Sequence, residues 1–456
     1  MKLRDILKFC NGTLIGDFDL NTEINKFSID SREIDENTFF IPLKGEKADG
    51  HDYIKGAFEK GAIGTFTSRD IESIPGKIII KVEDTLEALQ NFAKNFRIQN
   101  NEIPLVAITG SVGKTTTKDM VYSVLSKKYN TLKTKGNFNN NIGMPLTLVN
   151  YKSEEIIVLE MGMNNLGEIS FLSNIAKPNI GIITNVGNSH IGNLGSRENI
   201  LKAKLEILDG MSEEGILIIN KDNDMLSTVE NVNQKIITFG IETDADFRAY
   251  NINVGNDFTS FNIKEDGKEY LVKLNLVGEK LVYNALAAWI IGKIYDVSIE
   301  DRIRALENTE FTKMRMNIKN LNNKILIDDC YNASPESMKV AIEALAKQIS
   351  RRKIAILGDM LELGEYSSKL HMLVGENVAK NKIDKLLITG EFANSIKDGA
   401  IKYGMKEEDI IIFNNTDEIA ENIEKYINEE DAILIKASRG MKFEKIVKIL
   451  EEIKWD

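Results

Sequence analysis

The alternation of apolar and polar positions predicts an α/β protein built from three successive units. In the middle of the chain, four apolar runs end in polar residues and are separated by helical stretches, which is typical of a parallel sheet. These runs are Leu105–Thr109, Ile156–Glu160, Ile180–Thr184 and Ile216–Asn220. Because ligands bind at the carboxyl ends of such strands, we expect the polar residues that end these runs to lie at a site.

The first unit, residues 1–83, is predicted to be a small α/β domain. Short apolar runs at Thr38–Ile41 and Lys77–Ile80 indicate strands, and Asp52–Lys60 has the pattern of a helix that ends before a glycine. A connecting helix over Glu83–Asn100, apolar on one face, then leads into the second unit.

The second unit, residues 84–312, ends in a different pattern. Phe247–Val254, Phe258–Ile263 and Tyr270–Leu276 alternate as antiparallel strands do, so we expect a meander attached to the edge of the sheet. Leu281–Ile294 is an almost entirely apolar helix.

The third unit, residues 313–456, is predicted to be Rossmann-like. Five apolar runs, most of them followed by helical stretches, give a series of βα units. They are Lys324–Asp328, Lys353–Leu357, Lys385–Thr389, Asp409–Phe413 and Ala432–Lys436. Ser334 followed by Pro335 marks the start of one of the helices. No G-x-G-x-x-G follows a strand here, so a dinucleotide cofactor is not indicated.

Composition supports an ordinary globular enzyme of about three domains. The chain has 456 residues and a formal charge of −11, which argues against broad binding to nucleic acid or anionic membranes. With two cysteines, Cys10 and Cys330, no disulfide framework is implied. No secretory signal and no apolar run of membrane-spanning length are evident, so we expect a cytoplasmic protein.

The strongest local signal lies directly after the strand Leu105–Thr109. Gly110 and Gly113 allow the backbone to bend around an anion, and Lys114 and Thr115 follow at the start of a helix. This layout predicts a loop that holds nucleotide phosphates, with Lys114 on the β/γ-phosphates and Thr115 on Mg²⁺. Ile108 stands at the first glycine of the usual pattern, and a turn with a surface lysine is the alternative.

Three further residues of the second unit could act with this loop. Glu160 ends a strand and could bind Mg²⁺, or it could be a surface acid. His190, one of three histidines, follows another strand end, although a lone histidine is more often structural. Lys204 lies on a predicted helix, where an ordinary charged face is the simpler interpretation.

Polar clusters outside the second unit are less specific. Asp30–Arg32 and Gly45–Asp52 could be solvated loops. In the third unit, Asp328–Ala333, Gly358–Gly364 and Lys436–Gly440 each follow a strand. We expect these three segments to share one binding edge that faces the phosphate loop across a cleft.

Three longer motifs give the sequence a family resemblance. They are Thr134–Pro145, Asp329–Pro335 and Gly358–Gly364. With the phosphate loop, the chain resembles the Mur ligases, ATP-dependent amide-forming enzymes of bacterial cell-wall precursor synthesis, over nearly its whole length. The resemblance implies a UDP-sugar-binding first domain, a central P-loop ATPase-type domain and a C-terminal Rossmann-like ligase domain. It also implies a monomer.

The resemblance also implies a reaction. ATP would phosphorylate the carboxylate of UDP-N-acetylmuramoyl-tripeptide, and the amine of D-alanyl-D-alanine would displace the phosphate. The alternatives are another ligase of the same fold, such as another peptidoglycan ligase or folylpolyglutamate synthase, and a non-catalytic regulatory protein with a P-loop. The Asp329–Pro335 and Gly358–Gly364 motifs speak against the other ligases.

Residue roles follow from the same resemblance. Catalytic roles fall to Lys114, His190 and Lys204. ATP would contact Gly110, Gly113, Lys114, Thr115, Thr116, Asn284, Arg315 and Asp329. Mg²⁺ would be held by Thr115, Glu160, His190 and Lys204, the last carbamylated by CO₂. The substrate residues are Ser31, Arg32, Gly45, Asp49 and His51 for the UDP-sugar; Asn139, Asn140, Thr184 and Asn185 for the tripeptide; and Tyr331, Asn332, Ser438 and Arg439.

Overall fold

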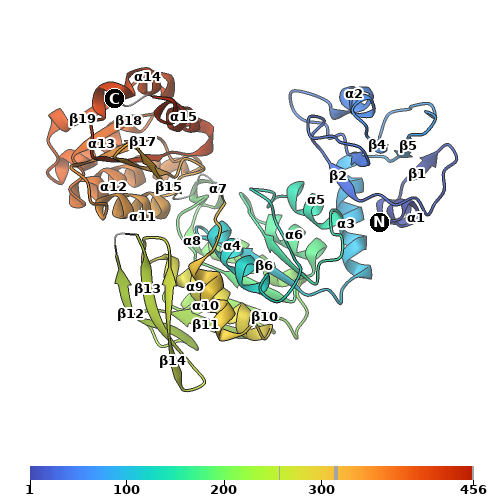
Figure 1. Ribbon diagram of the computed structural model, residues 1–456, viewed down its shortest axis with the longest axis horizontal. Coiled ribbons are helices and arrows are strands. Elements are labelled where there is room, and N and C mark those ends of the chain that lie inside the picture. The colour runs from blue at the N-terminus through green and yellow to red at the C-terminus, as the bar shows by residue number, and fades with distance from the viewer. Residues whose placement is uncertain (256, 313–316, 454–456) are drawn as a thin grey trace.

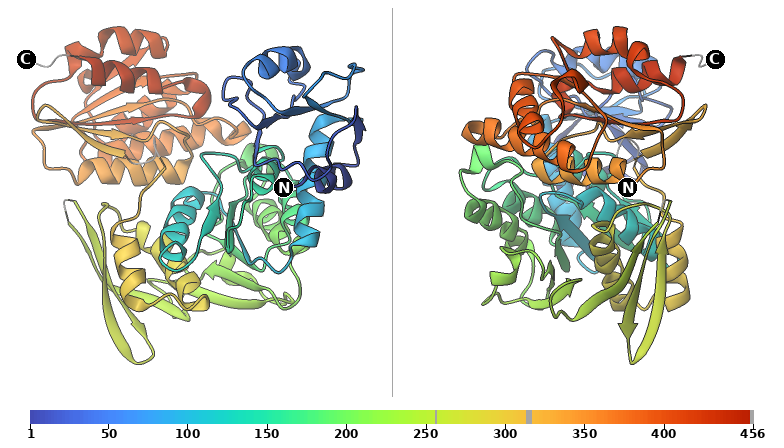
Figure 2. Two further views of the ribbon diagram at one scale, coloured as in Figure 1. Left: turned by 45° about the vertical axis from the view of Figure 1, so that its right-hand side comes forward. Right: turned by 90° about the vertical axis from the view of Figure 1, so that its left-hand side faces the viewer.

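The computed structural model describes residues 1–255, 257–312 and 317–453, and it contains three sheets in chain order. Figure 1 shows the central unit in cyan to yellow, with the N-terminal unit (blue) and the C-terminal unit (orange to red) beside it. The two views of Figure 2 agree that both outer units lie on the same side of the central unit. The three-domain α/β architecture is therefore as predicted; the domain boundaries at 83/84 and 312/313 stay a prediction.

The N-terminal sheet has the order β1-β5-β4-β3-β2, with only the β1–β5 pair antiparallel. Its strands are β1 (Thr13–Ile15), β2 (Lys26–Ser28), β3 (Thr38–Phe40), β4 (Gly64–Thr67) and β5 (Ile78–Lys81). The helices are α1 (Leu3–Cys10), α2 (Ile54–Glu59) and the connecting helix α3 (Thr85–Gln99). The side chain of Asp84 caps α3 by accepting from the backbone N–H of Glu87.

The central sheet has nine strands in the order β14-β13-β12-β11-β10-β9-β6-β8-β7. The predicted meander is confirmed: β12, β13 and β14 pair antiparallel, and β12 joins the parallel part through β11. The strands are β6 (Leu105–Thr109), β7 (Thr131–Lys133), β8 (Ile156–Glu160), β9 (Ile180–Ile183), β10 (Ile216–Asn220), β11 (Lys235–Gly240), β12 (Phe247–Val254), β13 (Thr259–Glu265) and β14 (Lys268–Leu274).

Two helices at the centre of this unit explain its apolar pattern. Almost all of α9 is buried, and it packs with α4 and the sheet into one apolar cluster. A helix that is apolar on all sides is stable only in such a position. The helices of the unit are α4 (Lys114–Leu125), α5 (Gly143–Val149), α6 (Glu168–Ala176), α7 (Ile191–Leu194), α8 (Arg197–Leu205), α9 (Leu281–Ile294) and α10 (Ile299–Glu307).

The C-terminal sheet has the order β15-β16-β20-β17-β18-β19 and is parallel apart from its edge strand β15. Its strands are β15 (Asn317–Leu321), β16 (Lys324–Asp328), β17 (Arg352–Leu357), β18 (Lys385–Thr389), β19 (Ile410–Phe413) and β20 (Asp431–Lys436). The helices are α11 (Pro335–Ala346), α12 (Ser367–Lys380), α13 (Ala393–Lys402), α14 (Thr416–Asn422) and α15 (Glu444–Glu452). Ser334 caps α11 with a reciprocal capping box, as its position before Pro335 predicted.

The sequence pattern missed several strands. β1, β2 and β7 are three residues long, too short to show a period. β15 is a largely polar strand at a sheet edge, where one side needs no apolar cover. The predicted helix Asp52–Lys60 is largely confirmed, because α2 covers Ile54–Glu59 and ends before Gly61; a short turn, Gly50–Tyr53, precedes it. Among the described helices, none is both long enough and apolar enough to span a membrane.

Candidate active site

The phosphate loop has the predicted geometry of strand β6, a tight loop and helix α4. Gly110 and Gly113 have φ angles of +151° and +83°, which side-chain-bearing residues rarely adopt. A Cβ on Gly110 would lie 1.9 Å from Oγ1 of Thr184, and a Cβ on Gly113 would lie 2.7 Å from Nδ2 of Asn284. Both glycines are therefore required by conformation and by space.

Thr184 and Asn185, predicted to line the tripeptide site, brace this loop. The Thr184 hydroxyl donates to the carbonyl of Val112 at 2.6 Å. Oδ1 of Asn185 accepts from the backbone N–H groups of Ser111 and Val112 at 3.1 and 3.0 Å. Both side chains also line the cavity described below, so a contact with substrate is compatible with this bracing role.

Lys114 folds back over the loop that it follows. Its Nζ donates to the carbonyls of Gly110 and Ser111 at 2.8 and 3.3 Å. The ammonium is thereby held at the mouth of a loop whose helix N-terminus already favours an anion. Thr116, the third residue of α4, also lines the cavity.

Thr115 and Glu160 form a buried pair of oxygen ligands beside the loop. The Thr115 hydroxyl donates to Oε2 of Glu160 at 2.8 Å, and Glu160 is fully buried. Nδ2 of Asn139 donates to Oε1 at 2.8 Å, so Asn139 orients this carboxylate. Asn140 caps the start of α5 by accepting from the N–H groups of Ile142 and Gly143.

This donor set fits Mg²⁺. A hydroxyl and a carboxylate are hard oxygen ligands, and they stand where the β/γ-phosphates of a nucleotide on this loop would end. Within the described residues, no three His, Cys, Asp or Glu side chains gather at one point. Mg²⁺ usually keeps several waters and takes few protein ligands beside substrate phosphates, so Thr115 and Glu160 can be the protein's share of one site.

Lys204 and Lys202 lie on the same helix, α8, but differ sharply in their exposure to solvent. Lys202 is exposed, whereas Lys204 is 1% exposed, and no described residue accepts a hydrogen bond from its amine. Burial, reinforced by the charge of Lys114, lowers the pKa of Lys204 well below its usual range. Glu206 is engaged elsewhere, accepting from the N–H groups of Gly167 and Ser170. The structure therefore favours an uncharged amine at Lys204.

His190 lies at the boundary with the C-terminal unit. Its Nδ1 is 2.6 Å from Oε2 of Glu362, which comes from the loop after β17. The hydrogen bond from His190 lowers the pKa of Glu362, and partial burial opposes that shift. Nε2 of His190 has no hydrogen-bond partner among the described residues.

A cavity of about 720 Å³ lies between the phosphate loop and the C-terminal unit. Its walls contain residues from both units, as the prediction of a shared cleft required. The predicted site residues that line it are Gly113, Lys114, Thr116, Thr184, Asn185, His190, Asn284, Asp329, Tyr331, Asn332, Ser438 and Arg439. The predicted N-terminal residues are not among the described residues of this lining.

The C-terminal wall is organised by a lysine that the prediction did not include among the site residues. Lys436, buried at the end of β20, donates to Oδ2 of Asp329 at 2.5 Å and to the carbonyl of Asn332 at 2.9 Å. Oγ of Ser438 accepts from the N–H of Leu361 at 2.9 Å. Lys436 ties two strand-end loops together, and its position at the end of a strand was the available signal.

Residues at the start of α9 also line the cavity. Nδ2 of Asn284 donates to the Thr117 hydroxyl at 2.8 Å, which couples α9 to the phosphate-loop helix. The hydroxyl of Tyr283 donates to Oδ2 of Asp222 at 2.9 Å, and Nζ of Lys280 lies 5.3 Å from the Tyr283 ring. These three residues line the cavity and were not predicted. Arg315, predicted to contact ATP, lies outside the described residues.

The predicted UDP-sugar residues fall into an exposed part and an interior part. Arg32 is exposed and pairs with Asp30 beside Ser31, and Gly45 is exposed in its loop. His51 is buried, with Nδ1 2.6 Å from Oδ1 of Asp49.

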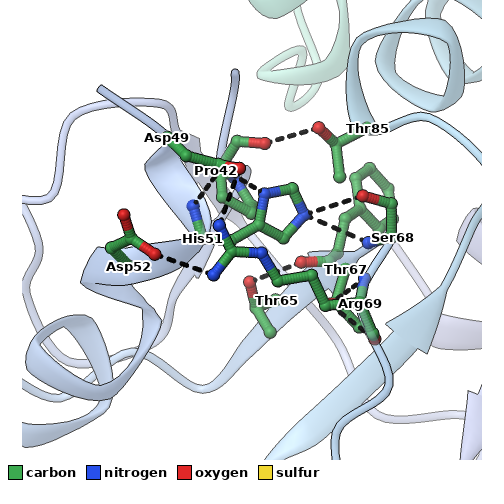
Figure 3. Close-up of polar contacts among 10 residues, drawn as sticks. Pro42, Asp49, His51, Asp52, Thr65, Thr67, Ser68, Arg69 and Thr85 are labelled. Atoms are coloured by element: carbon green, nitrogen blue, oxygen red, sulfur yellow. Dashed lines mark hydrogen bonds and ion pairs between the residues drawn. The ribbon is translucent and has the colours of Figure 1, made fainter. Parts of the chain in front are cut away.

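Figure 3 shows that both nitrogens of His51 are engaged by the protein. Its Nε2 accepts from the backbone N–H of Ser68 at 3.1 Å, and Arg69 pairs with Asp49 and Asp52 at 2.7 Å each. His51 therefore fixes the loop 45–50 against the end of β4 and has no ring nitrogen left for a substrate.

Comparison with known families matches all three units. The model of the Mur ligase middle domain matches residues 108–292, that of the Mur ligase, glutamate ligase domain matches 314–439, and that of the Mur ligase family, catalytic domain matches 23–97.

Curated relatives and solved structures match over nearly the whole chain. The UDP-N-acetylmuramoyl-tripeptide–D-alanyl-D-alanine ligase of Bacillus subtilis is 38% identical over 99% of this chain and 98% of its own. The Escherichia coli ligase of the same name is 32% identical over the same shares. A crystal structure of MurF from Acinetobacter baumannii has a TM-score of 0.87 at 30% identity, covering 99% of both chains. MurF from Thermotoga maritima in complex with ADP has a TM-score of 0.79 at 29% identity, covering 94% of this chain and 97% of its own. The chain therefore belongs to the Mur ligase family.

Proposed function

We propose that this protein is the ligase that joins D-alanyl-D-alanine to UDP-N-acetylmuramoyl-tripeptide at the expense of ATP. The observation that carries the proposal is the cavity in which the phosphate loop faces the strand-end loops of the C-terminal unit. The relatives that match this chain end to end carry the name of that ligase. The 12% identity to a folylpolyglutamate synthase supports only a shared fold.

The reaction needs two steps in one dry site. A carboxylate oxygen of the tripeptide first takes the γ-phosphoryl group of ATP, and ADP is released from the bond that breaks. The amine of the dipeptide then attacks the carbonyl carbon, phosphate leaves with the former carboxylate oxygen, and the nitrogen loses its proton. A carboxylate becomes a good electrophile only when one of its oxygens is part of such a leaving group, and exclusion of water protects the acyl phosphate.

The chain's own residues supply charge and position for these steps. The amide groups of the phosphate loop and Lys114, held 2.8 Å from the carbonyl of Gly110, would bind the ATP phosphates. Asn284 and Asp329 would contact the nucleotide from the two walls of the cavity. Mg²⁺, when bound, would neutralise the phosphate charge so that two anions can approach. Thr115 and Glu160 would hold one ion, and His190 and Lys204 a second.

Lys204 would serve as a metal ligand after reaction with CO₂. Its buried environment favours the neutral amine, and the neutral amine adds CO₂ with loss of a proton. The resulting carbamate has two anionic oxygens, which are hard ligands suited to Mg²⁺. A residue that would repel the metal as an ammonium thus becomes an anion that binds it.

The tripeptide substrate would extend from the N-terminal unit into the cavity. We propose that Ser31, Arg32 and the backbone around Gly45 contact the UDP-sugar, while Asp49 and His51 hold that loop in place. Asn139, Asn140, Thr184 and Asn185 would lie along the tripeptide, and Tyr331, Asn332, Ser438 and Arg439 on the dipeptide side. Cytoplasmic location and a monomeric state stay predictions.

The test is phosphate release measured with ATP, UDP-N-acetylmuramoyl-tripeptide and a panel of dipeptides. The proposal expects release that depends on D-alanyl-D-alanine and a product heavier by one dipeptide minus one water. Release that is independent of any dipeptide, with no new product mass, would identify an ATPase instead. A product formed with a single amino acid would identify another ligase of the family.

A further inference from the structure

His190 belongs to the central unit, but the group that orients it belongs to the C-terminal unit. The pair His190 Nδ1–Glu362 Oε2, 2.6 Å long, joins residues 172 positions apart in the sequence. With Glu362 ionised, Nδ1 carries the proton and donates it, so Nε2 keeps its lone pair. Because no described residue bonds to Nε2, this lone pair is available to a ligand in the cavity that His190 lines.

The backbone on both sides of the pair is held in an unusual conformation. His190 has φ +64° and Glu362 has φ +67°, a left-handed geometry that non-glycine residues rarely adopt. A non-glycine residue persists in this conformation only where its surroundings enforce it. His190 and Glu362 both have this conformation and bond to one another across the boundary between the two units. The backbone of each loop therefore helps to fix the position of its side chain.

Further contacts fix the two loops against each other. We use the name interdomain clasp for the residues that touch across the boundary, which are His190, Gly192 and Gly195 on one loop and Glu362, Gly364 and Tyr366 on the other. The backbone N–H of Gly192 donates to the carbonyl of Glu362 at 3.2 Å, and the Tyr366 hydroxyl donates to the carbonyl of Gly195 at 3.2 Å. A Cβ on Gly192 would lie 2.5 Å from the nitrogen of Gly364, so the two backbones touch. The clasp therefore forms only when the C-terminal unit is docked.

We propose that Glu362 is a positioning residue for His190, through which docking of the C-terminal unit presents Nε2 as a ligand for the second Mg²⁺. The proposal rests on the function proposed above. A histidine ligand commonly donates its other N–H to a carboxylate, which fixes the tautomer and the ring orientation. Here the carboxylate belongs to a different unit from the histidine, so one metal ligand becomes oriented only in the docked arrangement.

Mn²⁺ bound beside a non-hydrolysable ATP analogue is the probe. Loss of an outer carboxylate typically weakens metal binding 10- to 100-fold, so Glu362→Gln should weaken one Mn²⁺ site by about that factor and reduce the nitrogen coupling of histidine in the pulsed EPR spectrum. His190→Asn should abolish that coupling. Gly192→Ala, which forces the loops apart without touching either side chain, should act like Glu362→Gln.

Glu365→Gln is the matched control, because it removes an exposed carboxylate three residues along the same loop. It should bind Mn²⁺ as the parent does. The proposal is overturned if Glu362→Gln and Glu365→Gln bind Mn²⁺ alike with unchanged nitrogen coupling, or if the parent shows no histidine coupling at all.

Nitrogen NMR gives a second readout that requires no metal and no activity. The chain has three histidines, so ¹⁵N-labelled histidine resolves each ring. In the parent at mildly alkaline pH, His190 should carry its proton on Nδ1, and Glu362→Gln should shift it towards a mixture of tautomers. An unchanged His190 spectrum would contradict the role of Glu362. Because neither readout requires turnover, both decide this role even if the dipeptide-dependent activity is absent and the proposed function fails.

Discussion

Two carboxylate–histidine pairs of the same length, both 2.6 Å, lie in different regions of the molecule and do different work. In the N-terminal unit, Asp49 binds Nδ1 of His51 while the N–H of Ser68 occupies Nε2, so the ring is a buried connector between loops. At the cavity, Glu362 binds Nδ1 of His190 and Nε2 remains available. The second ring nitrogen, rather than the pair itself, decides whether such a histidine builds the fold or serves a site.

Loss of Lys114 should give the largest effect on the cavity side of this comparison. Lys114→Ala removes the charge at the ATP phosphates, and one such preorganised group is worth about 100- to 1000-fold in rate. Steady-state kinetics should show that loss in kcat with an unchanged thermal unfolding curve. A rate within about threefold of the parent would refute the phosphate-loop assignment.

Lys204 should come next, because its proposed carbamate would share a metal with His190. We expect Lys204→Ala to lose about 100-fold in kcat and to be partly rescued by acetate, whose carboxylate replaces the carbamate oxygens. Lys202→Ala, which changes an exposed lysine two residues away, should retain activity and ignore acetate. A dead Lys202→Ala beside an active Lys204→Ala would show that the assignment has the wrong lysine.

Because His51 connects two loops, its loss should lower the stability of the fold and leave kcat nearly unchanged, unlike the loss of Lys114 or Lys204. His51→Ala removes the ring that bonds to Asp49 and leaves the N–H of Ser68 without its partner, at a cost of about 1–3 kcal/mol in the free energy of unfolding. KM for UDP-N-acetylmuramoyl-tripeptide should rise about tenfold while kcat stays near the parent value. Asp52→Asn, on an exposed side chain of the same cluster, should change stability by less than about 0.5 kcal/mol. A fall in kcat alone would place His51 in the chemistry instead.

The smallest expected effect is a change in the pH dependence of stability on replacing the third histidine, His371. Like His51, it connects two segments through both ring nitrogens. Its Nε2 accepts from the N–H of Met360 at 2.9 Å, and Nδ1 donates to the carbonyl of Ser367 at 2.7 Å. Burial lowers the pKa of His371 below its ordinary value of 6.5. The unfolded chain therefore takes up this proton first, and stability is lost as the pH falls below 6.5 towards the lowered pKa, while no loss occurs above 6.5.

Urea unfolding on either side of pH 6.5 measures that contribution. His371→Gln should show a shallower loss of stability towards acid, by up to about 1.4 kcal/mol for each unit of the pKa shift. An identical pH dependence in parent and variant would mean that His371 is not neutral in the folded state.

Local backbone chemistry explains what the sequence could predict. The phosphate loop could be predicted because its functional residues, Gly110, Gly113, Lys114 and Thr115, lie within a few positions of one another. The five βα units of the C-terminal domain could be predicted because their strands contain continuous apolar runs. The residues alone would have assigned Lys204 to a charged helix face; its role as a metal ligand is implied by the family resemblance and stays a prediction.

Contacts between distant segments could not be predicted. The pairing of His190 with Glu362 depends on docking of two units, and the bonds that Thr184 and Asn185 make to the phosphate loop depend on strand order. The pattern suggested a solvated loop around His51 and the resemblance a UDP-sugar contact, because its partner Ser68 lies 17 positions away at the end of another strand. In each case the sequence pointed to the residue itself, whereas its hydrogen-bond partner depends on the tertiary fold.

The most direct test measures whether an oxygen atom of the tripeptide carboxylate is transferred to the released phosphate. UDP-N-acetylmuramoyl-tripeptide labelled with ¹⁸O in the reacting carboxylate is incubated with ATP, Mg²⁺ and D-alanyl-D-alanine, and the released phosphate is analysed by mass spectrometry. If the carboxylate is phosphorylated and the amine displaces the phosphate, each phosphate carries one ¹⁸O from the tripeptide and one ADP is formed per ligated product. Unlabelled phosphate, with all of the ¹⁸O retained in the peptide, would contradict the account.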